Sequence, residues 1–410
     1  MGDVTSAAEA AEAAARRSYG KLVAILAART GDVAGAEDAL SEAFGAALAD
    51  WPVRGVPATA EAWLLTVARR RIVDAVRRRQ QDDDASRHFA LLEELAEPAD
   101  ANALPDRRLE LLFACAHPGI DRQAHAPLML QTVLGFDAGT IASAFLVAPA
   151  AMGQRLVRAK AKIRQAGIGF RVPGPAELPP RLDSVLEAIY AAYAEGWTDG
   201  GGADPRRRNL AEEAIWLGRL VAALLPGEAE ALGLLALMLH AHARRAARRD
   251  ARGEYVPIAA QEVSRWDAAM IDEAEGLLHR ANAFASPGRY QLEAALQSAH
   301  SVRRAGAPVP WAAIVGLYDA LQALSPSPVT ALNRAVASAE VQGPAAALAA
   351  LDALGSDARL RDYQPYWAAR AELLARAGHA AQARAAYERA IGLERDEAVR
   401  RFLQQRAALL

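Results

Sequence analysis

Basic side chains gathered on two separate segments are the residues of this chain best suited to chemistry. Six arginines lie within the eleven residues from Arg69 to Arg79, and Trp63 stands shortly before them. Five further cations lie between Gln154 and Arg164. Arginines on an exposed helix neutralise phosphates, and a neighbouring aromatic ring can stack on an unpaired base. A solvated basic surface is the competing interpretation, but the density of the first segment favours nucleic acid.

The second basic segment is expected to form the last helix of a helix-turn-helix. Residues 126–165 predict a helix, a short helix capped by Thr140, and a basic helix whose first turn accommodates Pro149. Apolar residues from Met152 to Ile163, spaced three and four apart, form one face of the basic helix, and cations form another. Such a helix can dock by one side while the other meets phosphates and base edges. Taken alone, it is equally compatible with a solvated surface.

Three predicted helices hold the first basic segment. They cover about residues 8–30, residues 33–50 after a cap at Asp32, and the stretch from Thr59 to Arg79. The second of them carries an acidic patch of Glu37, Asp38 and Glu42. Most acidic helix faces are simply solvated, and a docking face for a basic partner is the functional alternative.

The bulk properties of the chain favour an all-α protein that acts in the cytoplasm. Its 410 residues are rich in alanine and arginine and poor in strand-favouring residues. Because the net charge is only -2, any DNA contact is expected to be local or shared with a partner. A single cysteine, Cys115, excludes a disulfide framework and fits a reducing compartment. The most apolar run, 231–241, is too short to span a bilayer, so no membrane role is expected.

Nothing in the sequence predicts an enzyme, a metal site or a cofactor. The histidines at 240, 242, 279 and 300 do not form an HExxH or comparable arrangement. No Walker, dinucleotide or Gly-x-Ser-x-Gly fingerprint is present. Cys115 and His117 lie two apart on a predicted helix and would not face one ion, so a structural role is expected for Cys115.

The remaining segments predict a linker and a helical extension. Residues 81–104 are acidic and lack sustained periodicity, which indicates a tether with at most one short helix. The Pro-rich stretch VPGPAELPP after Arg171 indicates a domain boundary. Beyond it the helices expected are 209–225, 228–248, 265–285, 289–304 and 311–324. Residues from Trp367 to Ala390 have the spacings of a tetratricopeptide unit, with a weaker copy at 333–354.

Several of these motifs together resemble a known family. The runs AEDALSEAF and AWLLTVARRRIVDAVRR resemble the second region of bacterial RNA polymerase sigma factors of the extracytoplasmic-function group, and residues 126–165 resemble their fourth region. The run PDRRLELLFACAHPGI, with AEGW, SRWD and LYDALQALSPSPVTALNRAVA, resembles a subgroup that has a long C-terminal extension. The resemblance implies region 2 at 1–80, the linker at 81–104, region 4 at 105–170 and the extension at 171–410, with tetratricopeptide-like repeats at 311–410.

The resemblance also implies roles for particular residues. The helix with Glu37, Asp38, Glu42 and Phe44 would bind the clamp helices of the polymerase β′ subunit, and region 4 would contact the polymerase flap. The −10 element would be melted and read by Trp63, Arg69, Arg70, Arg71, Asp74, Arg77 and Arg78. The −35 element would be read by Gln154, Arg155, Arg158, Lys160, Lys162 and Arg164. Many members of the group have asparagine where this chain has Arg70, so the −10 preference does not carry over.

The sequence therefore predicts a sigma factor that binds RNA polymerase core and promoter DNA. Its extension would replace a membrane anti-sigma factor as the regulatory input and would bind a protein or peptide ligand. One alternative is a helix-turn-helix regulator with a tetratricopeptide-like sensor, which would bind DNA without polymerase. Another is a pure scaffold, for which both arginine-rich helices would be irrelevant.

Overall fold

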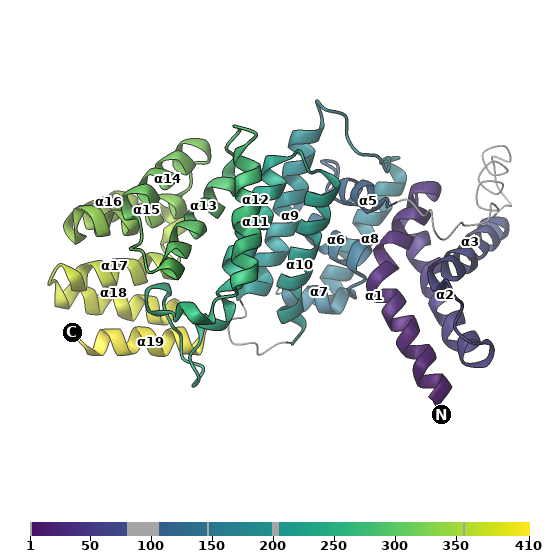
Figure 1. Ribbon diagram of the computed structural model, residues 1–410, viewed down its shortest axis with the longest axis horizontal. Helices are drawn as coiled ribbons and strands as arrows, with labels where there is room; N and C mark the ends of the chain where they lie inside the picture. The colour runs from purple at the N-terminus through teal and green to yellow at the C-terminus, as the bar shows by residue number, and fades with distance from the viewer. Residues whose placement is uncertain (1, 80–105, 146, 199–204, 356) are drawn as a thin grey trace. The chain divides into compact units, whose positions relative to one another are not determined.

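The computed structural model describes residues 2–79, 106–145, 147–198, 205–355 and 357–410, and this part of the chain is all-α as predicted (Figure 1). Within these ranges the β-pairing is one isolated bridge between Arg249 and Tyr255. The chain divides into two compact units. Unit 1 is Met1–Gly196 with Arg206–Ala214, and unit 2 is Trp197–Pro205 with Ile215–Leu410.

Unit 1 is built from helices that the sequence largely predicts. They are α1 (Gly2–Thr30), α2 (Val33–Arg54), α3 (Ala60–Arg79), α5 (Arg108–Cys115), α6 (Arg122–Leu134), α7 (Ala138–Ala144), α8 (Pro149–Gln165), most of α9 (Leu178–Thr198) and the start of α10 (Pro205–Leu224). The Asp32 side chain accepts from the Gly35 N–H at 3.1 Å, so the predicted cap of α2 is confirmed. The predicted cap at Thr140 is wrong, because Asp137 precedes α7 and accepts from the Thr140 N–H at 2.9 Å. The predicted linker at 81–104 lies outside the described residues.

Helix α1 is the central element of unit 1. Its residues from Leu22 to Ala27 are all 3% exposed or less, so this part of the helix is buried on every side. It contacts α2 and α3, and it also contacts α5 and α6. At Gly20 the approach is so close that an added Cβ would lie 2.1 Å from the Val133 carbonyl oxygen of α6. The first three helices and the helix-turn-helix segment therefore share one core.

The helices α5, α6 and α9 are joined by a buried contact, a half-buried hydrogen bond and an exposed ion pair. The Cys115 side chain is fully buried, its sulfur lies 3.4 Å from the Thr132 hydroxyl, and burial raises the pKa of the thiol to about 12. The Arg181 guanidinium of α9 donates to the Phe113 carbonyl at 2.6 Å. Arg122 of α6 pairs with Glu187 of α9. Helix α9 thus packs within unit 1, although it follows the Pro-rich connector that predicts a domain boundary.

Unit 2 continues with nine further α-helices in the described residues. They are α11 (Ala229–Ala243), α12 (Ala268–Asn282), α13 (Arg289–Ser301), α14 (Trp311–Leu324), α15 (Pro328–Gln342), α16 (Pro344–Leu354), α17 (Gln364–Arg376), α18 (Ala380–Leu393) and α19 (Glu397–Ala408). Residues 231–240 of α11 are all buried, as expected for the most apolar run of the chain. Helices α11 and α12 are shorter than predicted, because short 3₁₀ turns occupy 245–248, 258–260 and 263–265 between them.

The last helices form successive antiparallel neighbours, and α17, α18 and α19 lie side by side in Figure 1. Ala371, Leu374, Ala383, Tyr387 and Ala390, which carry the predicted repeat spacing, are all 4% exposed or less. Gly378 lies between α17 and α18 with a φ of +82°, a conformation that favours glycine. The predicted spacing therefore does mark the packed face of this helix pair.

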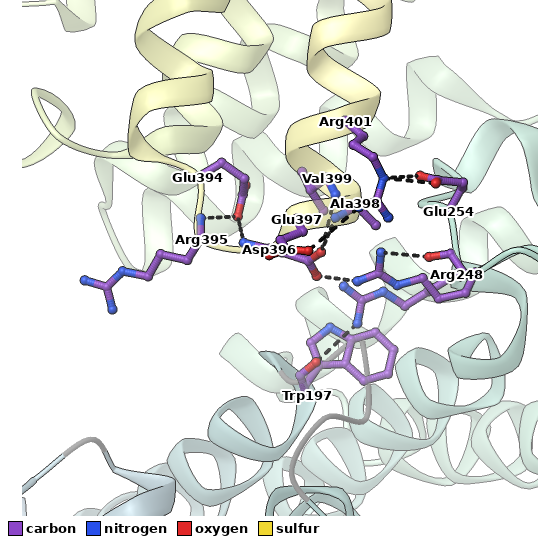
Figure 2. A network of polar contacts seen from close by, with 12 residues as sticks. Trp197, Arg248, Glu254, Glu394, Arg395, Asp396, Glu397, Ala398, Val399 and Arg401 are labelled. Carbon is purple, nitrogen blue, oxygen red and sulfur yellow. Dashed lines mark hydrogen bonds and ion pairs between the residues drawn. The ribbon is translucent and has the colours of Figure 1, made fainter.

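A network of polar contacts joins the segment after α11 to the last helix (Figure 2). Asp396 caps α19 by accepting from the Ala398 N–H at 2.9 Å, and it also pairs with Arg249. Arg401 on α19 binds Glu254 at 2.9 Å. The Arg248 guanidinium lies 4.4 Å from the centre of the Trp197 ring. Arg249 and Asp396 are 147 positions apart in the sequence, and their contact helps to fix the end of the helical array.

Candidate nucleic-acid and polymerase interface

Helix α3 presents an exposed basic face next to an aromatic pair. Arg70 and Arg71 are exposed, and Leu64 on the same helix is fully buried. Trp63 is half-buried and packs edge-to-face on the buried Trp51, with 5.6 Å between ring centres. This contact fixes the orientation of the Trp63 ring at the start of the basic helix.

The other residues predicted to read the −10 element are placed differently. Arg69 is only 5% exposed, so its guanidinium does not join those of Arg70 and Arg71 on the surface. Leu65, one helical turn earlier, is fully buried, so the face of α3 that carries Arg69 points inward. Asp74 is exposed, and the side chains of Arg77 and Arg78 lie outside the described ones.

Helix α2 divides the three acidic residues of the predicted patch between surface and interior. Asp38 is exposed, and the Glu42 side chain is 58% exposed and lies 3.3 Å from the Arg71 Nε of α3. Phe44 is half-buried. Glu37, in contrast, has a side chain only 11% exposed, so the outward-facing acidic patch consists of Asp38 and Glu42.

The predicted face of helix α8 is confirmed by its packing. Met152, Leu156, Ala159 and Ile163 are all 5% exposed or less. Gln154, Arg158 and Lys162, spaced four residues apart, are exposed and form one outer row. Arg155 is half-buried and lines a cavity of about 310 Å³ together with His125, Phe145, Ser184 and other residues of α6 and α9.

The two remaining cations of α8 face helix α2. Lys160 pairs with Glu37, and Arg164 lies 3.3 Å from the Asp32 carboxylate at the start of α2. Burial raises the pKa of Glu37 above its usual value, against the opposing effect of the Lys160 ammonium. Burial beside Glu37 and Asp38 also raises the pKa of Tyr19. The Lys160–Glu37 pair joins residues 123 positions apart, so local sequence patterns could not predict it.

No ion or membrane site is found in the described part of the chain. There, no three His, Cys, Asp or Glu side chains come together as metal ligands would. Among the described helices, none combines the length and the apolar character that crossing a bilayer requires. The His117 ring instead accepts from the Gly119 N–H at 3.0 Å, which is a local turn contact.

Comparisons with known proteins give two family matches and one long relative. Residues 15–81 match sigma-70 region 2, and residues 181–282 match a family of unknown function, DUF6596. An uncharacterized protein of Rhizobium meliloti (strain 1021) is 39% identical over 364 residues, which are 87% of this chain and 86% of that protein. No solved structure matches. The chain belongs to one family with the Rhizobium protein, and its sigma-70 region 2, formed by α1, α2 and α3, makes it an RNA polymerase sigma factor in the general sense.

Proposed function

We propose that this sigma factor belongs to the extracytoplasmic-function group and directs promoter recognition with two separate basic helices. In this proposal α3 melts and reads the −10 element, and α8 reads the −35 element. The observation that carries the proposal is the exposed pair Arg70 and Arg71, about two helical turns after Trp63 on α3, within the segment that matches region 2. Guanidinium groups next to an aromatic ring suit a strand whose bases are unpaired.

The acidic surface of α2 is the proposed docking site for the polymerase core. Asp38 and Glu42 are the carboxylates on its outer side, and basic residues on the β′ clamp helices would complement them. The Glu42–Arg71 ion pair at 3.3 Å joins α2 to α3, which supports a docking surface adjacent to the proposed −10 reading helix. A polymerase that binds α2 would therefore bring single-stranded DNA close to α3.

We further propose that the C-terminal extension controls activity and binds a protein or peptide. Support comes from α9, which follows the Pro-rich connector and holds α5 and α6 through Arg181 and Arg122. A ligand that alters the position of α9 would thereby act on the helices that support α8. The alternating helix pairs from α14 to α19 are the part of the extension proposed to bind that ligand.

Run-off transcription with purified polymerase core tests the proposed DNA contacts. The double variant Arg70→Ala, Arg71→Ala is expected to co-elute with core but to lose initiation, and the salt slope of promoter binding should fall by about one unit for each phosphate contact removed. The control is Arg359→Ala, Arg389→Ala, which removes two exposed, ion-paired arginines from unit 2. Full initiation by the first variant would refute the proposed role of α3.

The docking surface is tested by reversing the charge of Asp38 and Glu42 to lysine. Core binding should be lost, because like charges would then meet across the interface. Since Glu42→Lys also breaks the pair with Arg71, the single variant Arg71→Ala serves as the control that loses only that pair. If the reversed variant still binds core, or if the unaltered chain occupies a promoter without ever binding core, a helix-turn-helix regulator would be the better description.

A further inference from the structure

The cavity that Arg155 lines is large enough for a small molecule. Its volume is about 310 Å³, and its walls come from α6, from the connection between α7 and α8, from α8 and from α9, all within unit 1. Small-molecule pockets in proteins hold about 300–1,000 Å³, so this one is at the lower end. It is about twice the cavity of about 150 Å³ that accommodates one benzene ring. The space therefore suits a ring with a short chain, or a short chain alone.

The inner wall of the cavity is apolar. Ala126 of α6 and Ala188 of α9 are each 5% exposed, and Pro127 is also buried. Phe145 and Val147 add half-buried apolar side chains from the connection before α8. A ligand with an apolar body would cover this surface and remove it from water, which favours binding.

The charged groups around the cavity leave one positive charge unbalanced. Arg122 pairs with Glu187, and their side chains are 73% and 48% exposed, which places this pair at the mouth of the cavity. Burial lowers the pKa of His125, so its ring is neutral near neutral pH. Arg155 is half-buried, and no hydrogen bond or ion pair links it to another described residue. The cavity therefore offers an anion a guanidinium group that no described carboxylate occupies.

The two halves of the chain build this cavity together. Arg155 lies on the helix proposed to read the −35 element. Glu187, Ala188 and Ala191 come from α9, within the segment that matches the family of unknown function. The first helix of the extension thus supplies one wall of a site whose only unpaired cation, among the described lining residues, belongs to α8.

We propose that this cavity binds a small carboxylate with an apolar body, of the arylalkyl or medium-chain type. The carboxylate binds the Arg155 guanidinium, whose planar fork matches its two oxygens, and the apolar body packs on Phe145 and Ala188. The consequence for transcription rests on the proposed function. A guanidinium paired with the ligand is no longer available to a DNA phosphate, so the ligand and the −35 duplex compete for Arg155. By linkage each weakens the binding of the other by the same factor.

Isothermal titration calorimetry on the full chain tests the site with phenylacetate, 3-phenylpropanoate and hexanoate. At least one of these carboxylates should bind in a one-to-one ratio. The alcohol with the same apolar body should bind roughly 10- to 150-fold more weakly, because it cannot form the hydrogen bonds of a charged group with Arg155. The proposal is overturned if none of the three binds at concentrations up to about 10 mM, or if the alcohol binds equally well.

Two pairs of variants locate the binding. Arg155→Gln should weaken it by the same roughly 10- to 150-fold, whereas Arg158→Gln removes an exposed arginine of α8 that does not line the cavity and should leave it unaltered. Ala191→Leu fills the cavity and should abolish binding. Its control is Ala194→Leu, which is also half-buried on α9 but outside the cavity. Unaltered affinity in Arg155→Gln would overturn the proposal, and this variant decides alone if circular dichroism shows that Ala191→Leu does not fold.

Run-off transcription separates this inference from the proposed function. With a saturating amount of the carboxylate that binds most tightly, initiation by the unaltered chain should fall at least 5-fold, the lower end of typical coupling between two sites. Ala191→Leu should initiate equally with and without the carboxylate. If the chain binds the carboxylate but never initiates with core, the proposed function is wrong and the site stands. If it initiates equally well with the site filled, the function stands and the competition for Arg155 is wrong.

Discussion

Replacing Lys160 by methionine would measure how much its ion pair with Glu37 stabilises unit 1. The substitution keeps the length of the side chain but removes the ammonium group, so Glu37 would stay buried without its partner. Breaking a buried pair by removing one partner costs about 3–5 kcal/mol, and residual exposure of 11–12% places this pair near the lower end. At about 3 kcal/mol, local opening of α2 and α8 should become roughly 150-fold more frequent.

Hydrogen exchange read by mass spectrometry measures the free energy of local opening for α2 and α8 separately from unit 2. Peptides of both helices should exchange faster in Lys160→Met, while those of α17 and α18 should be unaltered. The effect should be smallest at acidic pH. Burial raises the pKa of Glu37 in the folded state, and removing Lys160 raises it further. Because the folded state then binds the proton more tightly than the unfolded state does, the unfolding free energy falls as pH rises from the unfolded to the folded pKa.

A double-mutant cycle makes the reasoning refutable. In Glu37→Gln, Lys160→Met neither charge of the pair remains, so this variant should be more stable than Lys160→Met alone. If the two substitutions instead destabilise α8 additively, the pair is not coupled, and Lys160 acts only through the packing of its aliphatic chain.

Three further predictions concern unit 2. Asp396→Ala removes a helix cap worth about 0.5–2 kcal/mol together with the Arg249 ion pair, so hydrogen exchange in α19 should become faster while α17 stays protected. Exchange in α19 as slow as in the unaltered chain would contradict the role of the cap. Leu374→Ala, at 4% exposure, should lower the unfolding free energy by about 2–5 kcal/mol, and an unaltered thermal midpoint would contradict its place in the core. Burial lowers the pKa of His240 to about 4, so the folded chain holds this ring neutral; the stability that the ring contributes is complete above its unfolded pKa and is lost as pH falls towards 4. The variant His240→Gln should flatten this dependence of the unfolding free energy on pH, and an unchanged slope would refute the prediction.

Local periodicity predicts those parts of the fold in which one face decides the packing. The four apolar residues from Met152 to Ile163 are buried as predicted, and α14 has the predicted bounds of Trp311 and Leu324. The helix capped by Asp32 also begins where its cap predicts. In each case the signal lies within one or two turns of the residue that it describes.

Features that depend on distant contacts could not be predicted in this way. Residues 245–248 and 265–267 were expected to belong to the two flanking α-helices, but Trp266 is buried with the Arg303 guanidinium 5.3 Å from its ring centre, and Asp267 caps α12. A tertiary contact of this kind outweighs helix propensity. The candidate site shows the same limit: Glu37 resembles its neighbour Asp38 in sequence, and only the partner on α8 separates them.

The burial of α1 on every side between Leu22 and Ala27 also bears on how the chain is made. Synthesis delivers α1, α2 and α3 before α6, so the part of α1 that α6 covers waits for its partner during translation. A chain that stops after α3 would leave apolar surface bare and prone to self-association. The nascent protein gains its complete first core only once the ribosome has passed the helix-turn-helix.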